Sequence, residues 1–178
     1  MHDHIEQILF DEDRILARLD EIGAQITRDY EGKDLVVVPI LHGGLILVAD
    51  LLRRVRLPLK MECLSVASYH GGTESSGKVT FNQLDLPDLD GAHVLVIDDI
   101  LDSGRTLDAI GRKIVEECAP ADLRICVLLD KKTERAVDVE PDYVGFEVGD
   151  EFVIGYGLDY QGRYRNLPYI GTLKEEYI

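Results

Sequence analysis

The sequence predicts an α/β fold, in which a mostly parallel, twisted sheet is flanked by helices. Short runs rich in β-branched residues alternate with segments that carry apolar residues at helical spacing. Several of these runs lead directly into glycine or polar residues. In parallel sheets of this class, ligands bind beyond the carboxyl ends of the strands, so these residues are candidates for a binding site. The length of 178 residues, with 46% hydrophobic and 30% charged residues, favours a single globular domain.

The first expected element is a helix over residues 11–30. Asp11 or Asp13 can cap its start, and Gly32 lies where such a helix should stop. The helix is predicted from an apolar stripe formed by Ile15, Leu16, Leu19, Ile22 and Ile26.

A buried strand is expected next, over residues 35–41, because LVVVPIL is short, apolar and rich in valine. The sequence His-Gly-Gly at 42–44 then predicts a turn, which leads into a second helix over 45–55. Residues 61–68 have the pattern of another strand.

A long polar stretch, residues 69–90, separates the two halves of the chain. Loops longer than about 12–15 residues are uncommon in compact domains, and many of them are lids or binding loops. A strand pair near residues 78–84 is the alternative, and both interpretations can hold together.

The second half continues the alternation of strands and a helix. We expect a helix over 106–118 and strands over 93–97, 124–129, 143–147 and 152–155.

The net charge argues against polyanionic partners. With 34 acidic and 19 Lys and Arg residues, the chain carries −15 at pH 7, which disfavours nucleic acid and anionic membranes. The start of the sequence, MHDHIEQILF, has no pattern of a signal peptide, and apolar runs stay far below the ~20 residues of a spanning helix. We therefore expect a cytoplasmic protein, with His2 and His4 outside its ordered part.

The most informative segment begins at Asp98, directly after the buried run HVLVI. Asp98 and Asp99 are hydrogen-bond acceptors when ionised, and they suit hydroxyl groups or a metal-bound water. Residues 103–106 (SGRT) open a helix, where free backbone N–H groups and the helix dipole favour an anion. A ligand with hydroxyls close to a phosphate, such as a ribose 5-phosphate, satisfies both halves.

Two other interpretations of this segment are weaker. DDILD matches the metal motif of prenyl-diphosphate synthases, but that motif belongs on a helix, and this one follows a strand. A plain surface turn explains one or two carboxylates, but not a pair after a buried strand with SGRT behind it. A Walker A loop is ruled out because GxxxxGK[ST] is absent.

The segment VLVIDDILDSGRTL resembles the phosphoribosyl-diphosphate (PRPP) signature of the type I phosphoribosyltransferases. PILHGGLILVADLL resembles the pyrophosphate loop of that family, and SVASYHGGTESSGKVTF resembles its flexible lid. The region from LLDKKT to LPYIG resembles the purine hood of the hypoxanthine-guanine branch. The similarity covers nearly the whole chain, from about residue 10 to 171.

The resemblance implies a type I phosphoribosyltransferase fold with a small hood formed mainly by the C-terminal region. It implies one domain over residues 1–178, with a core at about 30–130. The hood would combine the N-terminal segment with residues 131–178.

The PRPP signature implies the following roles. Asp98 and Asp99 would hold the ribose 2- and 3-hydroxyls, and Asp102 would be the catalytic residue near N7 of the purine, as base or proton holder. The residues that would surround the ribose and its 5-phosphate are Asp98, Asp99, Asp102, Ser103, Gly104, Arg105 and Thr106.

The pyrophosphate would be bound by His42, Gly43 and Arg165, although Arg163 is close enough in sequence to be confused with Arg165. Some family members carry Lys or Arg where this chain has His42, and a histidine carries less positive charge at pH 7 than either of them. The peptide bond before this residue is often cis in the family.

Mg²⁺ is the implied cofactor, with Asp159, Asp98 and Asp99 as its carboxylates. Ser68 and Tyr69 would belong to the lid, which would close over the pyrophosphate and shield the reaction from water.

The purine would be bound by Lys131, Phe152 and Val153. Lysine is a donor only, so it favours a carbonyl at position 6 of the base over the amino group of adenine. Lys132 is adjacent, and the sequence leaves the choice between the two lysines open.

The implied function is purine salvage, in which an enzyme transfers the 5-phosphoribosyl group from PRPP to hypoxanthine or guanine. The same chemistry on xanthine is the nearer alternative. A regulatory nucleic-acid-binding protein on this fold is the more distant one, because the only compact basic cluster, residues 53–60, is small. The family implies a homodimer or homotetramer.

Overall fold

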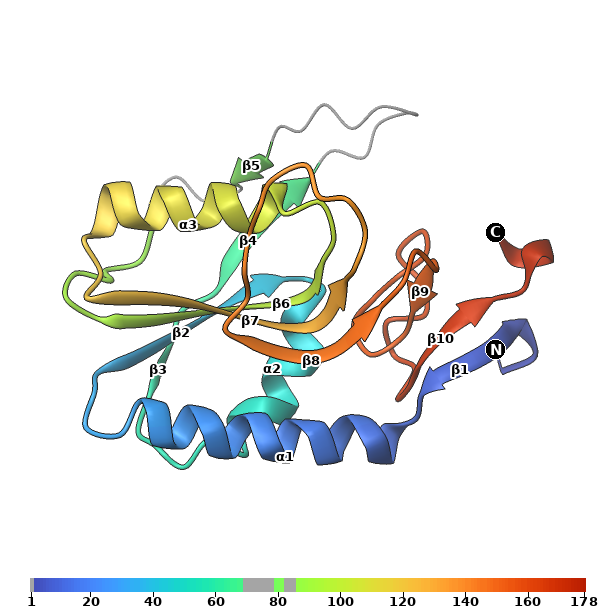
Figure 1. Ribbon diagram of the computed structural model, residues 1–178, viewed down its shortest axis with the longest axis horizontal. Coiled ribbons are helices and arrows are strands. Elements are labelled where there is room, and N and C mark those ends of the chain that lie inside the picture. The colour runs from blue at the N-terminus through green and yellow to red at the C-terminus, as the bar shows by residue number, and fades with distance from the viewer. Residues whose placement is uncertain (1, 69–78, 82–85) are drawn as a thin grey trace.

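The computed structural model describes residues 2–68, 79–81 and 86–178 and contains two sheets (Figure 1). The lid residue Tyr69 and the rest of residues 69–78 and 82–85 lie outside the described residues. The predicted α/β class is confirmed, because seven described strands form one mostly parallel sheet. Six of them lie in the order β5-β4-β2-β6-β7-β8, and the seventh, β3, pairs with β2. Its strands are β2 (Leu35–Leu41), β3 (Lys60–Met61), β4 (Leu64–Ser68), β5 (Val79–Phe81), β6 (His93–Leu101), β7 (Asp122–Lys131) and β8 (Tyr143–Val148).

Helices cover both faces of this sheet. Helices α1 (Glu12–Asp29) and α2 (Gly44–Leu52) lie on one face, and α3 (Arg105–Cys118) lies on the other (Figure 1). Strand alternation explains the two layers of core, because successive side chains point to opposite faces. Leu95 of β6 packs in the cluster with α1 and α2, whereas Val94 packs in the cluster with α3.

Helix α1 is capped by one of the two residues that the sequence offered as caps. Asp11 is the N-cap, and its carboxylate accepts a hydrogen bond of 2.8 Å from the backbone N–H of Arg14. The helix buries Ile15, Leu19, Ile22 and Ile26 of the predicted stripe.

A small antiparallel sheet brings the two chain termini together (Figure 1). It consists of β1 (Ile5–Phe10), β10 (Ile170–Leu173) and β9 (Val153–Ile154), in that order. Strands β1 and β10 were missed by the sequence analysis. Their partners lie about a whole chain length apart, and only one residue of β1, Phe10, is buried, so neither gives a clear alternating pattern.

Two predicted strands are too short, and the difference matters for the site. Strand β6 does not stop at Ile97 but continues to Leu101, because Asp98, Ile100 and Leu101 stay in register with β7. The paired acids therefore stand on a central strand and not in a loop. Strand β7 likewise extends to Lys131.

The alternative of a strand pair in the polar stretch is confirmed for its described part. Strand β5 pairs antiparallel with β4, with Ser68 opposite Val79.

The expectation that His2 and His4 lie outside the ordered part is wrong. They form a 3₁₀ turn (His2–His4) against the small sheet. The ring of His4 stacks on Tyr177 with 4.0 Å between the ring centroids, and its Nδ1 lies 2.9 Å from the Tyr164 hydroxyl. The Nδ1 of His2 lies 2.7 Å from the Tyr169 hydroxyl.

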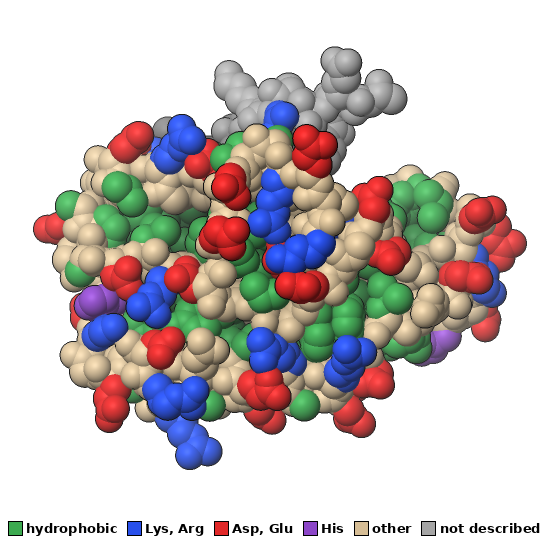
Figure 2. Space-filling view, in the orientation of Figure 1, with side chains coloured by type: hydrophobic (Ala, Val, Ile, Leu, Met, Phe, Trp, Pro, Cys, Tyr) green, Lys and Arg blue, Asp and Glu red, His purple; other side chains and the backbone are tan. Residues whose placement is uncertain are grey.

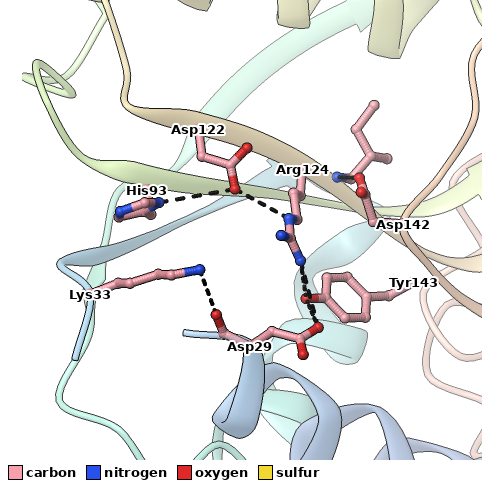
Figure 3. A network of polar contacts seen from close by, with 8 residues as sticks. Asp29, Lys33, His93, Asp122, Arg124, Asp142 and Tyr143 are labelled. Atoms are coloured by element: carbon pink, nitrogen blue, oxygen red, sulfur yellow. Dashed lines mark hydrogen bonds and ion pairs between the residues drawn. The ribbon is translucent and has the colours of Figure 1, made fainter. Parts of the chain in front are cut away.

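A polar network ties α1 to the amino ends of β6 and β7 (Figure 3). Arg124 contacts Asp122 at 3.1 Å and Asp29 at 3.6 Å, and the Tyr143 hydroxyl donates to Asp29 at 2.8 Å. His93, the first residue of β6, lies 4.0 Å from Asp122. The network fixes the end of the sheet that faces away from the carboxyl ends of its strands.

Among the described residues, no helix is long and apolar enough to cross a membrane.

Candidate active site

A cavity of about 440 Å³ lies at the carboxyl ends of β2 and β6. This is where ligands bind in open α/β sheets. Among its lining residues are ten that the sequence analysis assigned to PRPP, pyrophosphate or metal: His42, Gly43, Asp98, Asp99, Asp102, Ser103, Gly104, Thr106, Asp159 and Arg165. Arg105 is not among the lining residues, although it is the first residue of α3 beside them.

The turn formed by residues 102–106, here called the phosphate turn, ends at the start of α3. Gly104 is the N-cap, with a left-handed φ of 79° and no side-chain capping bond. The first backbone N–H groups of a helix have no intrahelical partner. Together with the helix dipole, they make the phosphate turn suitable for an anion.

The paired acids on β6 share a crowded, buried position. Asp98 is buried, and its carboxylate accepts a hydrogen bond of 3.0 Å from the backbone N–H of Asp99. Burial, reinforced by the neighbouring charge of Asp99, raises the pKa of Asp98 well above its ordinary value. Burial also raises the pKa of Asp99, while hydrogen bonds from Asp98 and Ile100 and the Arg165 charge oppose that rise.

The pyrophosphate loop packs directly on these acids. The Leu41–His42 peptide bond is cis, as the family resemblance implied. A Cβ atom added to Gly43 would lie only 1.9 Å from Oδ2 of Asp99, so the backbone approaches the carboxylate as closely as glycine allows. His42 is exposed and lines the cavity.

The segment after β9 closes the cavity from the other side. Arg165 contacts Asp159 at 2.6 Å and donates to the carbonyl of Gly157 at 2.6 Å. Asp159 also accepts a hydrogen bond of 2.7 Å from the backbone N–H of Gly162. Arg165 therefore faces the cavity, whereas Arg163 is exposed and pairs through its backbone with Tyr160.

Gly157 is a residue that sequence reasoning missed. Its φ of 104° is left-handed, and a Cβ there would lie 2.2 Å from the carbonyl oxygen of Gly43. The segment that follows β9 and the pyrophosphate loop are thus in backbone contact. The glycine-rich sequence around Gly155 and Gly157 was the available signal, but the contact partner is more than a hundred residues away.

Lys131 stands at the end of β7, beside the phosphate turn. Its Nζ lies 3.9 Å from the Asp102 carboxylate and 3.2 Å from that of Asp150, and its side chain is only 15% exposed. Lys132 points elsewhere, to Asp130 and Glu147, with a side chain that is 51% exposed. Of the two lysines, Lys131 is the one that the fold places near Asp102.

The other two predicted purine contacts lie at the start of β9. Phe152 is 49% exposed, an unusual exposure for a large apolar side chain, and its ring meets that of Tyr160 edge-on at 5.6 Å. Val153 is buried, with its backbone paired to Thr172. Neither residue lines the cavity described above.

Replacing Asp98 with asparagine should stabilise the ligand-free protein at alkaline pH. An acid whose pKa is raised by folding contributes stability below its unfolded pKa, and that stability is lost as the pH rises through the folded pKa. The raised pKa of Asp98 therefore makes the folded state less stable as the pH rises, whereas an asparagine at position 98 stays neutral and can still accept a hydrogen bond from the backbone N–H of Asp99.

The Asp98→Asn variant should therefore melt at a higher temperature than the parent at pH 8, and the difference should shrink towards pH 4. Differential scanning calorimetry across this range measures it. A variant that melts lower than the parent at pH 8 contradicts the argument.

Comparisons with known proteins agree with this geometry. Residues 6–161 match the family model of the phosphoribosyl transferase domain. The chain is 45% identical over 176 residues to a hypoxanthine-guanine phosphoribosyltransferase of Staphylococcus aureus, covering 99% of this chain and 98% of the relative. It is 43% identical over 176 residues to the enzyme of that name from Streptococcus pneumoniae, covering 99% and 97%.

Solved structures show the same similarity in three dimensions. A crystal structure of a hypoxanthine phosphoribosyltransferase from Staphylococcus aureus superposes with a TM-score of 0.94 at 45% identity, covering 99% of this chain and 96% of the other. The chain thus belongs to the phosphoribosyltransferase family, and it is an enzyme of the hypoxanthine-guanine branch.

Proposed function

We propose that this enzyme transfers the 5-phosphoribosyl group of PRPP to hypoxanthine or guanine, giving IMP or GMP and pyrophosphate. The observation that carries the proposal is the cavity itself. It joins the carboxylates of β6 and the phosphate turn to the pyrophosphate loop and Arg165, and Lys131 stands beside Asp102. This arrangement matches a ligand with ribose hydroxyls, a 5-phosphate and a second phosphate group.

In the proposed reaction, N9 of the base forms a bond to C1 of the ribose as the bond from C1 to the pyrophosphate oxygen breaks. The pyrophosphate leaves with the electron pair, and Asp102 accepts a proton from N7 of the base. Asp98 and Asp99 orient the ribose, the phosphate turn holds the 5-phosphate, and Arg165 presents a planar fork of donors to the pyrophosphate.

Lys131, Phe152 and Val153 would select the base. Lys131 would donate to the carbonyl at position 6, Phe152 would stack its exposed ring on the purine, and the backbone of Val153 would pair with the purine edge. The low exposure of the Lys131 side chain and its two carboxylate neighbours support a fixed position for its ammonium group.

The donor set fits Mg²⁺. Asp98, Asp99 and Asp159 line the cavity and offer the oxygen ligands that this ion prefers. Among the described residues, no group of three or more His, Cys, Asp or Glu is placed to hold a metal ion. The proposed ion would therefore need waters and phosphate oxygens of the substrate as further ligands. Bound Mg²⁺ would neutralise charge on the pyrophosphate as it leaves.

The surface charge of the protein argues against the alternative function of nucleic-acid binding. On the face shown in Figure 2, basic side chains are interspersed with acidic ones over the described residues. A net charge of −15 adds to this argument against a polyanionic polymer.

We further propose that the core and the hood act as one domain, with Ser68 and Tyr69 in a closing lid. The cytoplasmic location and a homodimer or homotetramer stay predictions.

A direct assay tests the proposal. The protein is incubated with PRPP and Mg²⁺ together with hypoxanthine, guanine, xanthine or adenine, and nucleotide formation is followed for each base. Product is expected with hypoxanthine or guanine and not with adenine. Absence of product with both of the first two bases would overturn the proposed function, and product with xanthine alone would favour the nearer alternative.

A further inference from the structure

The phosphate turn rests on another loop, formed by residues 132–139 and here called the support loop. The backbone N–H of Val137 donates to the carbonyl of Ser103 at 3.1 Å. The carbonyl oxygen of Val137 lies so near Gly104 that a Cβ atom there would be 2.3 Å from it. The backbone of the support loop is therefore in direct contact with the backbone of the phosphate turn, and any displacement of Val137 displaces the phosphate turn.

The side chain of Arg135 contacts both ends of the support loop, through one ion pair and one hydrogen bond. Asp130, at the end of β7, is 1% exposed and forms an ion pair with Arg135, whose side chain is 14% exposed. The other arm of the same guanidinium donates to the carbonyl of Val139 at 2.8 Å. Arg135 thus connects the end of the strand with the far end of the loop, and Val137 lies between these two points.

The charge on Asp130 makes this connection rigid. A buried carboxylate is strongly unfavourable unless it is paired, so Arg135 has few alternative positions. Lys132 also contacts Asp130, at 2.5 Å, but its side chain is half-exposed and it makes no bond to Val139 among the contacts of the described residues. Arginine is needed for the connection because its planar fork reaches two acceptors at once.

We propose that Asp130 and Arg135 are positioning residues for the 5-phosphate of PRPP, which they fix through the support loop and the phosphate turn. This role rests on the proposed function. Neither residue lines the cavity that contains the phosphate turn, so neither touches the 5-phosphate there. The pair also stands next to Lys131, so the strand end that carries the predicted purine donor is fixed by the same contacts.

The proposal predicts a selective effect on one part of the substrate. Arg135→Lys keeps the positive charge but loses the second arm to Val139, so the support loop loses one of its two anchors. We expect the Kd for ribose 5-phosphate to rise about tenfold, the effect of weakening one hydrogen bond to a charged group. We expect the Kd for magnesium pyrophosphate to stay unchanged, because no hydrogen bond or ion pair among the described residues joins the pyrophosphate loop or Arg165 to the support loop.

Isothermal titration with these two probes measures both constants for the parent, Arg135→Lys, Arg135→Met and the control Lys132→Met. Arg135→Met should raise the Kd for ribose 5-phosphate more than Arg135→Lys does, whereas Lys132→Met should have the same Kd values as the parent. Circular dichroism confirms that each variant is folded, and Arg135→Lys carries the test if Arg135→Met is not.

The outcomes separate the two proposals. If the parent binds neither ribose 5-phosphate nor PRPP, the proposed function fails and this role fails with it. If the parent binds ribose 5-phosphate and Arg135→Lys binds it equally well, the proposed function stands and the positioning role is overturned. The same holds if Arg135→Lys loses affinity equally for ribose 5-phosphate and magnesium pyrophosphate.

Discussion

Replacing Asp102 with asparagine should lower kcat by about 10²- to 10⁴-fold, the usual contribution of a positioned general base. The KM for PRPP should change little. Asparagine has the shape of aspartate but cannot accept the proton from the base. The side chain of Asp102 is 57% exposed and lines the cavity, so its replacement removes no buried interaction and the fold should be unaffected. Steady-state kinetics with hypoxanthine and PRPP separate the two parameters.

A second role for Asp102 must be distinguished from proton transfer. Its carboxylate lies 3.9 Å from Lys131, so its loss can act by releasing that lysine. Asp150 supplies a matched control because it contacts the same Nζ at 3.2 Å, is 89% exposed and does not line the cavity. Asp150→Asn should turn over close to the parent rate. Equal losses in the two variants would show that Asp102 only holds Lys131.

The local chemistry of the site could be predicted because it is continuous in sequence. The acids, the phosphate turn and the start of α3 follow one another within nine residues, 98–106, and helix starts and glycine turns have local signals. The end of strand β6 was harder to predict from the sequence. Asp98 and Asp99 look like loop residues, but the ladder from β6 to β7 continues beyond them. Their burial, and hence their raised pKa, follows from that ladder.

Contacts between distant segments could not be predicted in the same way. The choice of Lys131 over Lys132 depends on where β7 ends and on which face its last side chain leaves, and the sequence of a strand end fixes neither. The contact between Gly157 and Gly43 and the pairing of β1 with β10 join opposite parts of the chain. Asp130 and Arg135 are ordinary charged residues in sequence, and only the fold shows that one of them is buried.

A substitution of Gly104 by alanine should damage both stability and PRPP binding. Alanine at a φ of 79° is strained by roughly 1 kcal/mol, because a side chain disfavours left-handed backbone. The new Cβ would also lie 2.3 Å from the Val137 carbonyl oxygen, a backbone atom that cannot rotate away. The phosphate turn and the support loop must therefore separate, and the KM for PRPP should rise by at least about tenfold.

Gly91→Ala isolates the contribution of the contact from that of the backbone strain. Gly91 also has a left-handed φ, of 67°, but a Cβ there meets no atom within 4 Å, and the residue lies outside the cavity. It should lose about 1 kcal/mol of unfolding free energy in urea, followed by circular dichroism, and retain the parent KM for PRPP. Gly104→Ala should lose distinctly more unfolding free energy than Gly91→Ala. If the two variants lose the same stability and both keep the parent KM, the phosphate turn does not depend on its contact with Val137. Asp130 and Arg135 could then not position the 5-phosphate through that contact.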